Sequence, residues 1–306
     1  MRRVARFGLA VATAAAIGGC GGRLPQPPPP ATTPLEARGR HLVRIASGCG
    51  CHGANFAGWR EGGPDALPRS LPFGERFVGP FGVVPASNIT PDRASGIGLW
   101  SDGEVRRAIT EGIVGRGDAA KRLHPLMSYH AYRGMARSDL DALVAYLRRL
   151  RPVDNGVPTR ELKTPVPQTP VADAAPPGPA EPPTEGVALG RYLVRHVSVC
   201  ADCHSPGEPG DSAGGPELSG KTLRLGGRAL VAPNLTPDRE TGLGRWSEGD
   251  IARYLRTGSR PDGGLAQSAM AGLILSSYSH YTPEEARAVA AYLKSLAPVR
   301  STVRGS

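Results

Sequence analysis

Aromatic residues are scarce in this sequence. Phe, Trp and Tyr make up 5% of the 306 residues, whereas glycine (41) and proline (31) are abundant. So few rings can fill only small hydrophobic cores, although the length allows two ordinary domains. Because small cores need a staple such as a metal or a cofactor, the residues that could bind one are the first to consider.

Long apolar runs are missing as well. The most apolar stretch lies near the N-terminus, spans about ten residues and is too short for a helix that crosses a bilayer. Arg2, Arg3 and Arg6 lie before or at its start, and small residues lead from it to Cys20. We therefore predict that residues 1–19 are an export signal. Because the end of this stretch resembles a lipoprotein lipobox, we also predict a lipid anchor on Cys20; a secretory signal with an incidental cysteine is the alternative.

Dense basic runs are absent, although the chain is basic overall. The formal net charge is +10, or +7 once the three arginines of the signal are subtracted. A basic surface favours acidic partners or anionic lipid headgroups, and export from the cytoplasm argues against nucleic acid as a partner. The sequence also contains no nucleotide-binding loop, nucleophile constellation or pair of carboxylates that would indicate an enzyme.

Two proline-rich stretches divide the chain. Residues 20–34 and 153–185 have the composition of extended segments, which we interpret as a tether and an interdomain linker. The rest of the chain predicts two domains, residues 35–152 and residues 186–300.

These two domains are copies of one another. Residues 39–44 (GRHLVR) match residues 190–195 (GRYLVR) at an offset of 151, and residues 88–92 (NITPD) match residues 234–238 (NLTPD) at an offset of 146. The second offset also relates the two tryptophans, Trp100 and Trp246. The chain is therefore a tandem duplication.

Each copy is predicted to be helical. Leucine, valine and alanine recur with helical spacing near the end of each copy, over residues 140–150 and 286–296. Ser101 with Glu104, and Thr282 with Glu285, have the spacing of capping boxes at helix starts. Since no stretch alternates with the period of a strand for long, we expect an all-α fold with long irregular loops.

The second copy contains a motif for a covalently attached cofactor. Cys200, Cys203 and His204 form C-x-x-C-H, the signature of haem attachment. Residues i and i+3 lie on one side of a helical turn, so both thiols can reach one porphyrin edge while His204 ligates the iron. The alternatives are a redox dithiol, a structural disulfide and half of a zinc site, but this copy lacks a βαβ pattern and a second pair of zinc ligands.

Haem iron accepts a sixth ligand, and a methionine thioether raises its reduction potential. After His204 the second copy contains one methionine, Met270, and one histidine, His280. We predict Met270 as the distal ligand, in a loop before the terminal helix; core filling is the alternative role for this side chain.

Together these features resemble the class I cytochromes c of bacteria, especially the cytochrome subunits of membrane-bound alcohol and gluconate dehydrogenases. The resemblance rests on the haem motif, on the Asn-x-Thr-Pro-Asp segments, on a Pro-Phe-Gly triplet at 72–74 or 80–82, and on residues 96–102 (GIGLWSD) and 127–132 (MSYHAY). It implies two tandem cytochrome c domains with a haem c in each. Those subunits usually carry three haem domains, and this chain has two.

The resemblance also assigns residues. It implies Met127 as the distal ligand in the first copy, and it suggests that the first and terminal helices cross closely at Gly39 and Gly190, against Tyr146 and Tyr292. The two tryptophans either face the haem edge or fill the core.

In the first copy the attachment motif is one residue short. It reads Cys49-Gly50-Cys51-His52, and the simplest alignment places Cys49 opposite Cys200 and deletes one residue between the cysteines. Residues i and i+2 of a helix point about 200° apart, so both thiols cannot face one porphyrin edge without distortion.

We therefore predict a first haem attached through Cys51 alone, with His52 and Met127 as axial ligands. A haem bound by both thiols and a haemless domain are the alternatives. His124 and His130 could replace Met127, although solvated loop histidines are the simpler interpretation.

The expected function, as the resemblance implies, is a membrane-anchored, periplasm-facing dihaem cytochrome c. It would carry single electrons from a dehydrogenase or another donor to a respiratory acceptor. The rivals are a dihaem peroxidase with one open distal position and a ligand-binding module with one five-coordinate haem.

Overall fold

The computed structural model describes residues 33–46, 51–52, 76–115, 117, 120–166, 177–207, 215–225 and 228–303. The predicted export signal, the lipid anchor at Cys20 and the thiol of Cys49 lie outside these residues and stay predictions.

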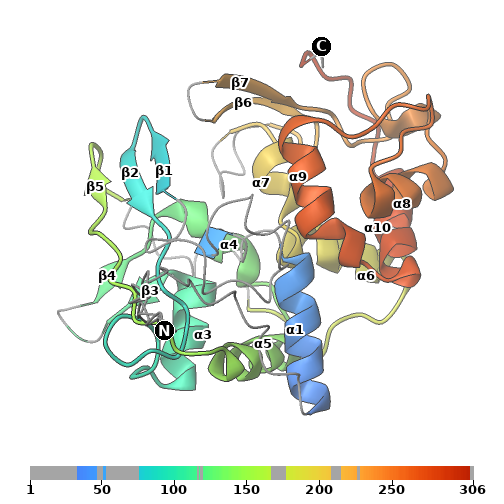
Figure 1. The fold of residues 1–306 in the computed structure, drawn as a ribbon. Coiled ribbons are helices and arrows are strands. Elements are labelled where there is room, and N and C mark those ends of the chain that lie inside the picture. The colour runs from blue at the N-terminus through green and yellow to red at the C-terminus, as the bar shows by residue number, and fades with distance from the viewer. Residues whose placement is uncertain are drawn as a thin grey trace, which may run out of the picture.

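The first copy occupies the left side and the bottom of Figure 1, and the second copy the upper right. The elements of the first copy are α1 (Pro34–Ile45), β1 (Arg76–Gly79), β2 (Gly82–Pro85), α3 (Asp102–Glu111), β3 (Ile113–Val114), β4 (Lys121–Arg122), η4 (Pro125–Met127), α4 (Tyr129–Tyr132), α5 (Arg137–Arg149) and β5 (Glu161–Leu162). The elements of the second copy are α6 (Gly186–Tyr192), the π-helix η6 (Leu193–Val197), α7 (Cys200–His204), β6 (Lys221–Leu225), β7 (Arg228–Ala232), η8 (Leu243–Arg245), α8 (Glu248–Thr257), α9 (Ser268–Ser276), η9 (Tyr278–His280) and α10 (Pro283–Ser295).

Two helices begin at the capping boxes that the sequence predicts. The Ser101 hydroxyl accepts from Glu104 N, and the Glu104 carboxylate accepts from Ser101 N at the start of α3. Thr282 and Glu285 make the same reciprocal pair at the start of α10. These bonds satisfy N–H groups that have no partner inside the helix, so local sequence fixes where each helix starts.

In each copy the first helix crosses the terminal helix at a glycine. A Cβ on Gly39 of α1 would lie 1.9 Å from the Ala142 carbonyl oxygen and 2.8 Å from Tyr146 Cβ of α5. A Cβ on Gly190 of α6 would meet Ala288 O and Tyr292 Cβ of α10 at the same two distances. Only glycine allows the backbones to approach this closely, which confirms the expected crossings at Gly39 and Gly190.

The repeated Asn-x-Thr-Pro-Asp segments hold the chain that follows each terminal helix. Asn88 donates to Val153 O (2.8 Å), and Asn234 donates to Val299 O (2.7 Å). Each asparagine also accepts from the backbone N–H two residues later. The segment therefore closes its own copy by hydrogen bonds over more than sixty residues of sequence.

The expectation of an all-α fold is met only in part. Helices dominate, but β1 and β2 form an antiparallel hairpin, and β6 and β7 form its counterpart in the second copy. The predicted linker also contributes structure, since β5 pairs with β2 and Lys163 N donates to Phe81 O. These strands are two to five residues long, which is too short for a periodic sequence pattern.

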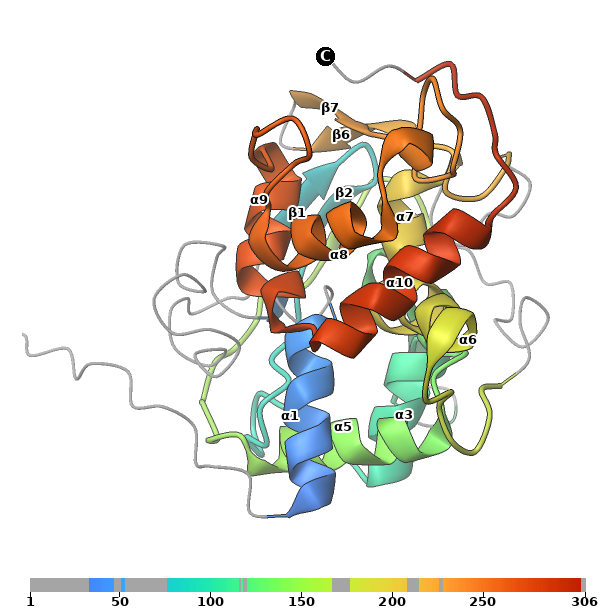
Figure 2. The same ribbon diagram turned by 90° about the vertical axis from the view of Figure 1, so that its right-hand side faces the viewer.

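The two copies share one apolar core. A single contiguous cluster of buried side chains runs from Leu42 and Val43 of α1 to Val289 and Leu293 of α10. Figure 2 shows α1 standing across α5, with α10 crossing α6 above it. The copies pack against each other where α1 meets η9, α4 meets η6 and β1 meets β6.

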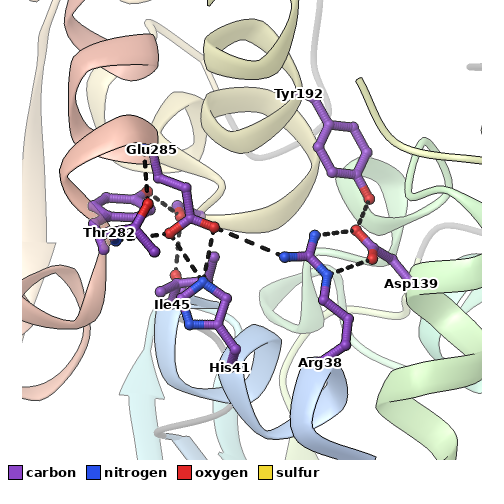
Figure 3. A network of polar contacts seen from close by, with 9 residues as sticks. Arg38, His41, Ile45, Asp139, Tyr192, Thr282 and Glu285 are labelled. Carbon is purple, nitrogen blue, oxygen red and sulfur yellow. Dashed lines mark hydrogen bonds and ion pairs between the residues drawn. The ribbon is translucent and has the colours of Figure 1, made fainter. Parts of the chain in front are cut away.

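The contact between the copies is reciprocal (Figure 3). His41 of α1 donates to Glu285 of α10 (Nε2 to Oε1, 2.8 Å), and Tyr192 of α6 donates to Asp139 of α5 (2.7 Å). His41 and Tyr192 are equivalent positions of the repeat, as are Asp139 and Glu285. Arg38 joins the two pairs, with a bidentate bond to Asp139 and an ion pair to Glu285 at 3.8 Å.

Candidate functional site

The two cysteines of the second motif lie on one short helix. Cys200 begins α7 and is half-buried, Cys203 is exposed, and His204 ends the helix. Neither cysteine is in a disulfide within the described residues. Burial raises the pKa of the Cys200 thiol to about 12, and the neighbouring Cys203 adds to the shift. The i, i+3 arrangement that haem attachment needs is present, with thiols in the protonated form.

His204 is oriented as a metal ligand would be. Its Nδ1 lies 2.8 Å from the carbonyl oxygen of Pro233, directly after β7. Because a carbonyl only accepts, Nδ1 must carry the proton, and Nε2 keeps its lone pair for a metal. Burial also lowers the pKa of His204, with a smaller effect from Lys221, which favours the neutral imidazole that binds iron.

His52 in the first copy has the same environment. Its Nδ1 lies 2.7 Å from Ser87 O, and burial lowers its pKa. Ser87 and Pro233 each stand directly before the asparagine of the closing segment. The two hairpins, together with the Asn-x-Thr-Pro-Asp segments at 88–92 and 234–238, thus position the two carbonyl oxygens that orient the histidines. Sequence reasoning misses these oxygens because a backbone carbonyl leaves no signature in side-chain chemistry.

The structure changes the alignment of the two motifs. In α1, Ala46 N donates to Leu42 O, four residues back, whereas in η6 Ser198 N donates to Leu193 O, five residues back. Leu42 and Leu193 are equivalent at offset 151, so Ala46 and Ser198 correspond at offset 152. A π-turn contains one residue more than an α-turn, and the additional residue of the second copy is therefore in η6 rather than between its cysteines.

This correction reassigns the shortened motif. At offset 152 Cys51 and His52 still align with Cys203 and His204. Cys49, however, falls opposite Ala201 and not opposite Cys200, the position that the simplest alignment gave it. The new count favours Cys51 as the attachment residue of the first copy.

The two candidate methionine ligands occupy different elements. Met127 ends the 3-10 helix η4, and Met270 is the third residue of α9, so the expectation that Met270 lies in a loop is wrong. Both side chains are half-buried and pack against the apolar cluster. The helix α9 begins without a side-chain cap, so the usual start signal is missing from its sequence.

The alternative histidine ligands have other partners. His124 Nδ1 accepts from Leu126 N, and the centroids of the His124 and Phe81 rings are 4.6 Å apart. His130 Nε2 lies 3.0 Å from Asp202 Oδ1. The tryptophans Trp100 and Trp246 are half-buried against the core, and the latter packs edge-on to Tyr254. His280 lies in η9.

The chemistry of the donors fits haem better than zinc. Among the residues that the structure describes, no group of three or more His, Cys, Asp or Glu side chains could hold a metal ion. Haem needs no such group, because the porphyrin supplies four nitrogen ligands and the protein supplies one or two. A single oriented histidine beside paired thiols is therefore sufficient for haem c and insufficient for structural zinc.

Comparison with known proteins agrees with this donor set. The profile of the family described as "Cytochrome c" matches residues 187–297. A protein named "Diheme cytochrome c-type" from Cereibacter sphaeroides is 31% identical over 280 residues, which cover 85% of each chain. The chain belongs to the cytochrome c family. The resemblance inferred from the sequence is thus confirmed, and membership of this family implies haem c as the cofactor and electron transfer as the function.

Other relatives of this cytochrome are subunits of dehydrogenases. The "Gluconate 2-dehydrogenase cytochrome c subunit" of Pantoea cypripedii is 32% identical over 285 residues, and the "Alcohol dehydrogenase (quinone), cytochrome c subunit" of Komagataeibacter europaeus is 30% identical over 296 residues. The alignments cover 86% and 89% of this cytochrome, but 59% and 58% of the relatives. Within the described residues no helix of the cytochrome is long and apolar enough to span a bilayer.

Proposed function

We propose that this cytochrome is a dihaem electron carrier made of two tandem class I domains. The observation that carries the proposal is the repeated orientation of His52 and His204. Each donates Nδ1–H to a backbone carbonyl at an equivalent position of the repeat, which leaves Nε2 available to a metal. A copy with only a structural role would have no need of this arrangement.

In this proposal each haem is held by attachment cysteines and by two iron ligands. Cys200 and Cys203 attach the second haem and His204 is its proximal ligand, while Cys51 and His52 do the same for the first haem with one thioether. Met270 and Met127 are the distal ligands. A bound haem would supply one-electron transfer at its iron, and a methionine thioether as ligand would keep its reduction potential high enough for a respiratory carrier.

The proposal extends to location and partners. We place the cytochrome at the periplasmic face of a membrane, held by the lipid on Cys20, with a redox protein as its partner. The names of the relatives favour a dehydrogenase as electron donor, and a respiratory component is the acceptor. The net positive charge left after removal of the export signal favours an acidic docking face on that partner.

Haem content tests the proposal most directly. The mature protein, expressed with a cytochrome c maturation system, is assayed by pyridine haemochrome and by mass mapping of the peptide that holds Cys49 and Cys51. We expect two haems per chain, the first attached to Cys51 with Cys49 unmodified.

Two matched variants assign the thioether. Cys51→Ala should reduce the haem content from two to one, whereas Cys49→Ala should leave two haems. A wild-type chain with one haem and an unmodified Cys51 would show that the first copy is structural and would overturn the two-centre carrier.

A further inference from the structure

We propose that Asp202 is a positioning residue that holds the distal ligand Met127 of the first haem in place from the second copy. This inference depends on the proposed function, because it assumes a haem in each copy. Asp202 lies between the two attachment cysteines of the second motif, so it links the haem site of one copy to the distal segment of the other.

The contact is made by Ser128 and His130, which follow Met127 by one and three residues in the sequence. Ser128 donates its hydroxyl to Asp202 Oδ2 at 2.5 Å, and His130 Nε2 lies 3.0 Å from Asp202 Oδ1. An ionised carboxylate only accepts, so His130 donates. Each carboxylate oxygen of Asp202 therefore accepts one hydrogen bond from residues 127–130, which we call the Met127 segment.

The environment strengthens these bonds. The side chains of Asp202 and His130 are each 16% exposed, and Ser128 is 7% exposed. Hydrogen bonds to a charged acceptor that is shielded from water are stronger than neutral bonds at the surface. The segment is thus fixed by shielded, charge-assisted contacts rather than by solvated ones.

The backbone of Ser128 shows what the contact maintains. Ser128 has φ 52° and ψ 23°, in the left-handed region that residues with a Cβ rarely adopt. It ends η4 and begins α4, so this one residue turns the chain directly after Met127. Its side-chain bond to Asp202 holds that conformation, and through it the position of the thioether.

A second serine hydrogen bond between the copies supplies a control for this contact. Elsewhere at the interface between the copies, Ser277 donates to Arg44 O at 2.8 Å, a bond of the same donor type that involves neither Asp202 nor the Met127 segment. It provides the matched control, since Ser277→Ala removes one serine hydrogen bond between the copies without loosening Met127.

The test measures how readily imidazole displaces the methionine ligand of the ferric protein. Loss of the methionine-to-iron charge-transfer band reports displacement, and Met127→Ala identifies the part of the signal that belongs to the first haem. Asp202→Ala should lower the imidazole concentration needed at that haem about tenfold, which corresponds to about 1.4 kcal/mol. Ser128→Ala should act in the same direction, and the double variant should add little to either single change.

The outcomes separate the inference from the proposed function. Two haems per chain, with imidazole titrations of Asp202→Ala and Ser128→Ala that match the wild type or the Ser277→Ala control, would overturn the role of Asp202 alone. A wild-type chain with one haem would overturn the proposed function and this role together. Asp202→Asn keeps one acceptor oxygen, so the imidazole concentration that displaces its Met127 should lie between those of the wild type and Asp202→Ala. Such a partial recovery would show that Asp202 positions Met127, because a variant that failed to fold would not recover.

Discussion

At the scale of single residues, His196 shows how the contact between the copies depends on protonation. Its Nδ1 lies 2.9 Å from Ala131 O of the first copy, and its ring is partly buried. Burial lowers the pKa of His196 below its ordinary value of 6.5, nearby Arg195 and Arg191 lower it further, and the bond to Ala131 opposes the shift. Folding therefore favours the neutral ring.

The sign of the pH dependence follows. As the pH falls below about 6.5, the unfolded chain protonates His196 before the folded chain does, so the free energy of unfolding decreases until the folded pKa is passed. Urea unfolding of wild type and His196→Gln between about pH 7.5 and pH 5 checks this. We expect the free energy of unfolding of the wild type to fall toward that of the variant in the acid range. Free energies of unfolding that stay parallel across this pH range would contradict the assignment.

At the scale of elements, the crossing of α6 and α10 depends on the missing side chain of Gly190. An added Cβ would lie 1.9 Å from the Ala288 carbonyl oxygen, so Gly190→Ala must push the helices apart. We expect a loss of about 3 kcal/mol in the free energy of unfolding, as is typical of overpacking.

A second helical glycine provides the control for this substitution. At Gly249 of α8 an added Cβ would meet only Ser247 Oγ at 3.7 Å. Gly249→Ala should therefore raise stability by up to about 1 kcal/mol, because alanine favours the helix. Equal effects of both substitutions in chemical denaturation would refute the close-packed crossing.

The elements also show how far sequence reasoning reaches. The capping boxes of α3 and α10 could be predicted because each follows from a few residues with fixed local geometry, whereas the glycine crossings were expected from the family resemblance alone. The hairpins, the helical setting of Met270 and the π-helix could not. They depend on short pairings, an uncapped helix start and one additional residue in a turn, none of which has a periodic signature. The role of Glu285 between the copies was equally hidden, since its partner His41 is 244 residues away.

At the scale of the whole molecule, Tyr192 joins the two copies through its hydroxyl. The hydroxyl donates to Asp139 and accepts from Ala136 N at 3.1 Å, both in buried surroundings. Tyr192→Phe would leave that N–H without its partner, so we expect a loss of about 2 kcal/mol in the free energy of unfolding.

Tyr254→Phe is the matched control, because the Tyr254 ring packs on Trp246 inside the second copy. Its effect should stay below about 0.5 kcal/mol. Calorimetry should show one unfolding transition for the wild type, as the continuous core requires. Two separate transitions, with the Tyr192 variant unchanged, would mean that the copies fold independently.

The reciprocal pairs His41 with Glu285 and Tyr192 with Asp139 have a meaning for the history of the chain. A surface patch that contacts its own duplicate through equivalent residues has the pairing of an isologous interface, the kind that joins two identical subunits in a symmetric homodimer. Fusion makes the association intramolecular and independent of protein concentration. Within one chain each half can change on its own, and the attachment motifs at Cys51 and Cys200 do differ.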